Sequence, residues 1–156
     1  MNEPYDVLIT RFPLFAGFTP HGAQMLMDRG EVTELPPGEL LFREGDAPTF
    51  ALLVLTGSLQ VFVVRDGRDL VLTNAGPGTI VGELAVLCGI PRSASVRASE
   101  QAAVLRWSAE AFRRLLLSDA FLSERILGES LRTLIEKERS LIDSLLRSQR
   151  DSNRAG

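Results

Sequence analysis

The chain has 156 residues, 45% of them hydrophobic and 24% charged, which is enough for one core and too short for two ordinary domains. Its formal net charge of -3 argues against a polyanion as main partner, because non-specific nucleic-acid binding depends on a surplus of lysine and arginine. We therefore expect a single domain that does not bind nucleic acid directly.

Signals for membranes and for oxidising compartments are missing from the sequence. No apolar run approaches the ~20 residues that span a bilayer, and "MNEPYDVLIT" lacks a basic stretch followed by an apolar one. Cys88 is the single cysteine, so the chain can form neither an internal disulfide nor a cysteine cluster for zinc. We expect a cytoplasmic protein without membrane insertion, in which Cys88 is a small buried hydrophobic residue.

Residues 1–30 form the first predicted unit, an N-terminal helical segment. Apolar residues recur at helical spacing along "FPLFAGFTPHGAQMLMDR". Thr19 followed by Pro20 is typical of a helix N-cap with a proline in the first turn.

Residues 31–118 form the second predicted unit, which is mainly β. Short apolar runs alternate with turn signals roughly every ten residues, the spacing of an all-β sandwich or small barrel. The turn signals are Pro37-Gly38, Gly45-Asp46, Asp66-Gly67 and Gly76-Pro77-Gly78. Asp66-Gly67 is the strongest hairpin signal, because it separates "LQVFVV" from "LVLTN". Ser108 then predicts the start of a helix that ends near Ser118.

A long helix over residues 119–150 is the third predicted unit. Its apolar residues, from Leu122 to Leu145, recur every three or four positions, and the helix is long for a globular protein. Glu138 interrupts the stripe in the distal half, where charges alternate. Such a helix projects from the body or pairs with a copy of itself. Residues 151–156 are predicted to be a disordered tail, similar to a linker that has been cut or has frayed.

One acid and one base bracket an apolar turn in "GELAVLCGIPRSASVRA". Glu83 and Arg92 are nine residues apart with no charge between them. A helix that starts after Gly82 would present the N–H groups of Gly82, Leu84 and Ala85 to an anionic oxygen. The Arg92 guanidinium suits a phosphate diester, whereas the Glu83 carboxylate needs a donor such as a ribose hydroxyl. A ligand with a phosphate close to a free 2′-hydroxyl satisfies both.

This segment resembles the phosphate-binding cassette of the cyclic nucleotide-binding domain family. The family pattern stands here without a gap as Gly82-Glu83-Leu84-Ala85 and then as Gly89-Ile90-Pro91-Arg92-Ser93-Ala94-Ser95-Val96. Supporting glycines lie upstream at Gly38, Gly45 and Gly57, and the resemblance extends from about Phe12 to Ser140. Two positions depart from the usual pattern: Val81 stands where phenylalanine is common, and the aromatic residue near Leu52 is displaced to Phe50.

The resemblance implies a fold that is mainly β with flanking helices. It is a β-roll, a double-stranded β-helix similar to a jelly roll, with a long C-terminal α-helix. The implied ligand-binding residues are Gly82, Glu83, Leu84, Ala85, Arg92, Ser93 and Ala94. Arg132 is a candidate lid residue over the base, with a solvated arginine as the alternative.

The function implied by the resemblance is a regulatory domain that senses a cyclic nucleotide. Cyclic AMP is the expected ligand, with cyclic GMP as the alternative. Ligand would draw the phosphate turn inward, the Ser108–Ser118 helix would follow, and the long helix would close as a lid or change its packing in a homodimer.

Other interpretations stay open at this point. The chain ends at Gly156, before a DNA-binding domain could form, so it is also interpretable as the sensor part of a catabolite-activator-type regulator. Glu83 and Arg92 could instead form a structural ion pair in a degenerate, ligand-free module. Neither a cupin metal site nor an enzymatic activity is expected, because the chain has a single histidine, His21, and no catalytic constellation.

Overall fold

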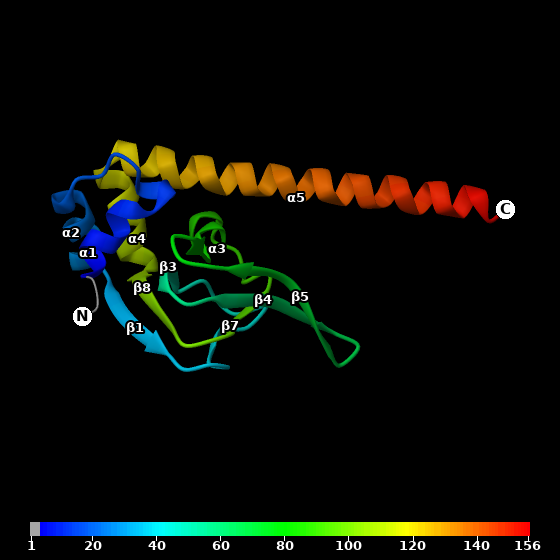
Figure 1. Cartoon of the computed structure of the whole chain (residues 1–156), viewed down its shortest axis with the longest axis horizontal. Coiled ribbons are helices and arrows are strands. Elements are labelled where there is room, and N and C mark those ends of the chain that lie inside the picture. Colours follow the sequence, from blue (N-terminus) through cyan, green and yellow to red (C-terminus); the bar gives the residue numbers. More distant parts are fainter. Residues whose placement is uncertain (1–3) are drawn as a thin grey trace.

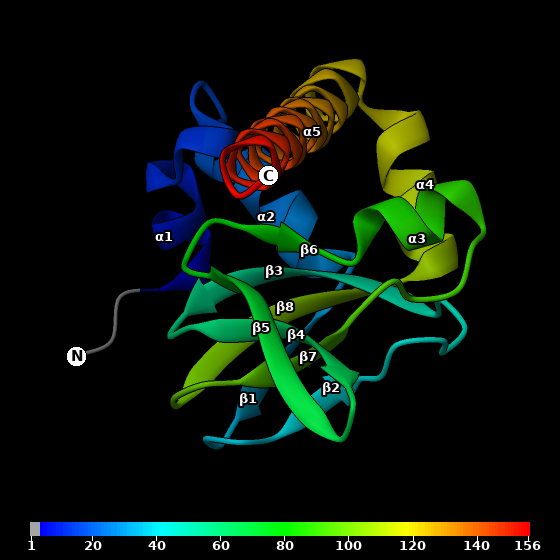
Figure 2. The ribbon, with the colours of Figure 1, turned by 90° about the vertical axis from the view of Figure 1, so that its right-hand side faces the viewer.

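The computed structural model describes residues 4–156, and it is a two-sheet β structure with helices on one side (Figure 1, Figure 2). The β-roll fold predicted from the sequence is confirmed. Of the N-terminal unit predicted over residues 1–30, the first three residues lie outside the described part. No helix in the described part is both long enough and apolar enough to cross a membrane.

The chain order of the elements sets the architecture. The helical elements are α1 (Tyr5–Arg11), the 3-10 turn η1 (Pro13–Phe15), α2 (Pro20–Asp28), α3 (Glu83–Cys88), α4 (Ala109–Ser118) and α5 (Ala120–Arg154). The strands are β1 (Glu31–Leu35), β2 (Leu40–Phe42), β3 (Phe50–Thr56), β4 (Leu59–Arg65), β5 (Arg68–Ala75), β6 (Ile80–Val81), β7 (Ser95–Ala98) and β8 (Ala102–Ser108). They form two antiparallel four-stranded sheets, ordered β1-β8-β3-β6 and β2-β7-β4-β5.

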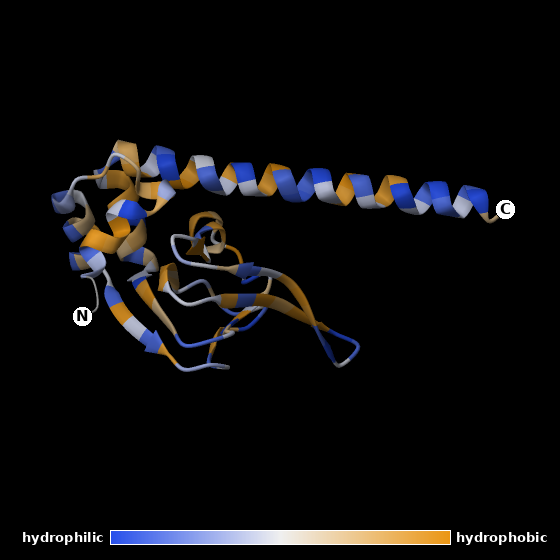
Figure 3. Ribbon diagram, in the orientation of Figure 1, coloured by the Kyte–Doolittle hydropathy of each residue, from blue (hydrophilic) through white to orange (hydrophobic). Residues whose placement is uncertain are grey.

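Strands β3 and β8 divide the interior into two cores. In β3, Leu53 and Leu55 face the core that lies against the helices, whereas Leu52 and Val54 face the core of the roll. Both faces are buried, so β3 reads as the continuous apolar run "FALLVLT", orange in Figure 3, instead of an alternating pattern. Trp107 of β8 is fully buried on the helix side, where its indole N–H donates to the Leu26 carbonyl. The helices therefore pack on a sheet that is itself anchored in the roll.

The turns fall where the glycine signals predict them. Asp66 and Gly67 both have positive φ, 54° and 72°, as a type I′ hairpin between β4 and β5 requires. Gly57, between β3 and β4, has φ 79°, and a Cβ there would lie 2.3 Å from the Gln101 carbonyl oxygen. Only glycine fits that position without moving the start of β8.

The helices start where the sequence predicts, but α5 ends later than the predicted residue 150. The side chains of Thr19, Ser108 and Asp119 each accept an N–H bond at the starts of α2, α4 and α5. The tail predicted to be disordered from residue 151 is instead helical as far as Arg154, because no glycine or proline occurs before Gly156 to end the helix. Cys88, expected to be buried, is exposed at the end of α3.

We expect Gly57→Ala to destabilise the fold more than Gly67→Ala does. Both variants place a side chain in the left-handed region, at a cost of about 1–2 kcal/mol. Only at Gly57 does the new Cβ also meet backbone, whereas nothing lies within 4 Å of it at Gly67. Urea unfolding should give a loss for Gly57→Ala that exceeds the control by about 1–3 kcal/mol. Equal losses would mean that the packing of β8 on this turn is loose.

Candidate functional site

A cavity of about 1070 Å³ lies between the β2-β7-β4-β5 sheet, the α3 region and the first half of α5. Gly82, Glu83, Leu84 and Ala85 line it from one segment, and Arg92, Ser93 and Ala94 line it from the loop before β7. The structure thus brings together all seven residues that the cassette pattern implies. The other walls are the face of α5 from Phe121 to Lys137 and the two residues Pro13 and Leu14 of η1. In Figure 2, which looks along α5, this helix lies above β5 and β6 and beside α3.

Arg92 is buried at the edge of this cavity, with 3% of its surface exposed. Its Nη1 donates to the Gly82 carbonyl at 2.8 Å, and its Nη2 donates to the Phe50 carbonyl. The guanidinium carbon lies 4.0 Å from the centre of the Phe42 ring and 5.0 Å from that of Phe50. Its Nε has no partner in the described part of the chain. A buried donor without an acceptor is costly, so this atom marks a place where a ligand oxygen would be favourable.

Gly82 shapes the space that the guanidinium occupies. Its φ is 81°, and a Cβ on it would lie 2.5 Å from Arg92 Nη1. A side chain here would displace the Arg92 guanidinium as well as strain the backbone. Gly82 is also the N-cap residue of α3, so the same glycine starts the short helix that the motif predicts.

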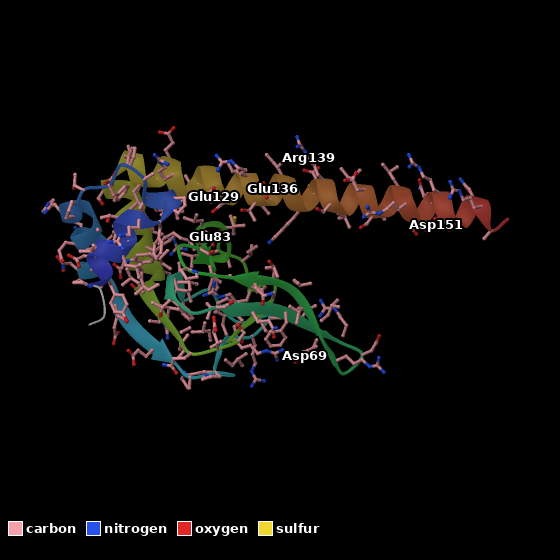
Figure 4. The ribbon with its side chains drawn as sticks, viewed as in Figure 1. Asp69, Glu83, Glu129, Glu136, Arg139 and Asp151 are labelled. Atoms are coloured by element: carbon pink, nitrogen blue, oxygen red, sulfur yellow. The ribbon has the colours of Figure 1, made fainter. Side chains whose placement is uncertain are left out.

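Glu83 is the first residue of α3, and its carboxylate contacts α5. Ser130 Oγ donates to Glu83 Oε1 at 2.9 Å. Burial raises the pKa of Glu83, while its backbone hydrogen bond, the hydrogen bond from Ser130 and the charges of Lys137 and Arg92 act in the opposite direction. Figure 4 labels Glu83 in the region of α3, beneath α5. The acid of the motif is therefore connected to the long helix.

Glu83 and Arg92 do not form an ion pair in the described part of the chain. Each bonds to other groups, so a structural ion pair does not explain why both are present. Burial lowers the pKa of Arg92, and the carboxylates of Asp46 and Glu83 oppose that effect.

The described residues also include no cluster of histidine, cysteine and carboxylate groups that could hold a metal ion.

The other expected residues are placed as follows. Ala85 and Ala94 are buried small residues, which lets the backbone lie close to the cavity. Ser93 is exposed and lines the cavity beside Arg92. Arg132 lines the cavity as well, but its guanidinium is exposed and bonds to Glu129 at 2.6 Å, which fits the solvated alternative.

Four residues at the site were missed in the sequence. Phe42 and Phe50 both contact the Arg92 guanidinium and pack edge to face against each other, and the sequence showed Phe50 only as a displaced aromatic residue. Ser130 and Lys137 act from α5, about fifty residues after the motif. No local pattern could have found these two, because their role depends on how α5 docks.

Comparison with known proteins decides the family. A family model described as "Cyclic nucleotide-binding domain" matches residues 32–119, more than half of the chain. The chain belongs to the cyclic nucleotide-binding domain family. It is 30% identical over 112 residues to a cAMP-dependent protein kinase regulatory subunit from Emericella nidulans, a match that covers 72% of this chain and 27% of the relative.

Solved structures of this family share the fold. The catabolite activator protein of Thermus thermophilus matches with a TM-score of 0.75 and 27% identity, covering 83% of this chain and 61% of that one. A cAMP-binding acyltransferase from Mycobacterium smegmatis matches with a TM-score of 0.60 and 30% identity, over 72% of this chain and 36% of that one. The chain thus spans about a quarter of the kinase subunit and about a third of the acyltransferase, proteins that carry this domain beside other parts.

We expect Glu83→Gln to stabilise the ligand-free fold at neutral pH. Burial disfavours the charged carboxylate, so the folded state holds the Glu83 proton to a higher pH than the unfolded state does. The stability of the native chain therefore falls as pH rises above the ordinary pKa of 4.5, while a neutral glutamine escapes that loss. The melting temperature of Glu83→Gln should exceed that of the native chain at pH 8, with the difference shrinking towards pH 4.

The matched control is Glu100→Gln, an exposed residue in the turn before β8. It should change the melting temperature little at either pH. A Glu83→Gln variant that is less stable than the native chain at pH 8 would contradict the account, since its carboxylate would then be stabilised and not penalised.

Proposed function

We propose that this chain is a regulatory domain that binds a cyclic nucleotide in the α5-covered cavity and transmits occupancy through α5. The observation that carries the proposal is the buried Arg92 guanidinium, which lines the cavity and keeps its Nε without a partner. A buried charge needs compensation, and main-chain carbonyls supply only part of it. An anionic oxygen at this position would complete it.

The cyclic phosphate takes the place next to Arg92 and Ser93. The guanidinium fork gives two parallel N–H bonds to phosphate oxygens, with Nε as the donor that becomes satisfied on binding. The backbone of Gly82, Leu84 and Ala85 approaches the same oxygens at the start of α3, where the N–H groups favour negative charge. The ribose 2′-hydroxyl donates to the Glu83 carboxylate, which lies on the neighbouring wall.

Cyclic AMP is the ligand we propose. The Emericella nidulans relative is a regulatory subunit of a cAMP-dependent protein kinase, and the Mycobacterium smegmatis relative is a cAMP-binding acyltransferase. Cyclic GMP is the alternative, because phosphate and ribose are common to both and the cassette contacts do not involve the purine. An affinity for cyclic GMP more than tenfold above that for cyclic AMP, about 1.4 kcal/mol, would reverse the assignment without changing the site.

The output of the domain follows from the position of α5. One half of this helix forms a wall of the cavity and the other half extends past the β4–β5 hairpin (Figure 1). Ligand that favours one position of the wall therefore shifts the population of positions of the distal half. The effector is an attached or partner protein. The resemblance to the catabolite activator protein favours a transcription regulator as the second candidate.

We expect Arg92→Leu to weaken cyclic AMP binding by about 2–5 kcal/mol, because it removes a charge-assisted bidentate contact from a desolvated site. Arg92→Lys should recover only part of this loss, since an ammonium keeps the charge and lacks the fork. Calorimetry with folded protein, verified by thermal melting, is the measurement. Arg68→Leu on the exposed hairpin is the control and should bind normally. Unchanged affinity in Arg92→Leu would remove the basis of the site.

A homodimer through α5 is the association we propose. Beyond its packed first turns, α5 exposes large apolar side chains in a stripe that alternates with charge, visible in Figure 3. They are Leu127, Leu131, Leu134, Ile135, Leu141, Ile142, Leu145 and Leu146. Leu127, Leu131, Leu134, Leu141 and Leu145 follow the heptad spacing of a two-stranded coiled coil, with Glu138 at the position between. A stripe of that period fits a second copy of the same helix.

We expect Glu138→Leu to tighten this dimer by at least about tenfold, because it replaces the charge inside the seam with a residue worth about 1.5–3 kcal/mol on burial. Glu136→Leu is the matched control, since it adds the same apolar group on the outer face of the helix. Analytical ultracentrifugation at high micromolar concentration, with and without cyclic AMP, should also show that ligand changes the association. Monomers throughout, or an equal effect of the two variants, would make α5 a simple lid.

A further inference from the structure

The contact between Ser130 and Glu83 lies at the point where α5 leaves the body of the domain. The buried residues of α5 are Leu122, Ile126 and Ser130, spaced by four, and every residue after Ser130 is exposed. Ser130 is thus the last buried residue of the helix and the one polar member of that row. Its hydroxyl bonds to the Glu83 carboxylate, the group that the proposed function assigns to the ribose.

The carboxylate has acceptor capacity for both partners. Ser130 occupies Oε1, and a carboxylate accepts bonds at each of its two oxygens. Oε2 can therefore take the ribose hydroxyl while Ser130 keeps its bond. Lys137 lies two helical turns after Ser130 on the same face, lines the cavity, and places a positive charge where it favours the ionised carboxylate. The α5 face thus supplies both a donor and a cation to Glu83.

We propose that Ser130 is a positioning residue for ribose recognition: it holds the Glu83 carboxylate with Oε2 turned to the 2′-hydroxyl. The affinity for the ligand then depends on whether α5 is docked. This inference rests on the proposed function. If α5 docking improves ribose binding, ligand must by reciprocity stabilise docking of α5 at Ser130. The ribose contact and the base of the projecting helix are then coupled through one carboxylate.

The experiment compares the affinities of cyclic AMP and 2′-deoxy cyclic AMP by calorimetry on the full chain. The native chain should prefer cyclic AMP, and Ser130→Ala should reduce this preference about 3- to 10-fold, the scale of one hydrogen bond. Affinity for the 2′-deoxy ligand should change much less, which also verifies folding. Ser140→Ala, on the exposed part of α5 beyond the cavity, is the matched control and should keep the native preference.

A pH series distinguishes this role from a merely structural one, because a structural serine would not change how the preference for the 2′-hydroxyl depends on pH. Without the Ser130 bond, the Glu83 carboxylate keeps its backbone hydrogen bond and the nearby charges of Lys137 and Arg92. It loses one of the groups that lower its pKa, so it takes up a proton at a higher pH. In Ser130→Ala the preference for the 2′-hydroxyl should therefore disappear at a higher pH than in the native chain. Ser130→Thr, which keeps the hydroxyl, should restore both the preference and its pH profile.

The outcomes separate this inference from the proposed function. A preference that is unchanged in Ser130→Ala, while the native chain binds and discriminates, overturns the role of Ser130 alone. A preference that increases also overturns it, because Ser130 would then compete with the ribose for the carboxylate. If the native chain binds neither nucleotide, the proposed function itself fails and the inference fails with it.

Discussion

The burial of one guanidinium organises this molecule. Arg92 lies inside a β-roll, where an isolated charge would be strongly unfavourable, and its compensation comes from several distant segments. The loop before β7 provides the arginine, the N-cap of α3 and the start of β3 provide carbonyl oxygens, and the adjacent aromatic rings of Phe42 and Phe50 both contact the guanidinium. Gly82 must lack a side chain for the same reason. A substitution at any of these groups would shift the Arg92 guanidinium, and the wall of the cavity that it forms would shift with it.

The second organising contact joins the cavity to α5. A helix of 35 residues extends from a domain that buries only its first turns, and the last of those buried positions bonds to Glu83. The group that the proposed function gives to the ribose therefore also fixes where the free part of the helix begins. Lys137, also on α5, adds a positive charge that favours the ionised form of the Glu83 carboxylate. In the proposed function, ribose recognition and the docking of α5 share the Glu83 side chain.

Local chemistry in the sequence predicts the fold well. The Asp66-Gly67 hairpin and the caps at Thr19 and Ser108 occur as expected, because each is decided by a few neighbouring residues. The cassette residues converge for the same reason, since Gly82 to Ala94 is a short continuous segment. The failures depend on longer range or on missing signals. The end of α5 was placed too early because polar residues without a glycine or proline do not stop a helix, and Ser130 was invisible because its role depends on docking.

Side-chain NMR of the arginine Nε–H groups tests most directly whether the Arg92 guanidinium receives the cyclic phosphate. The Arg92 signal is assigned by its loss in Arg92→Lys. On titration with cyclic AMP we predict that this signal moves downfield and exchanges more slowly with water, because Nε gains an acceptor that it lacks in the described structure. Saturable binding of cyclic AMP that leaves the Arg92 Nε–H signal unchanged would contradict the account.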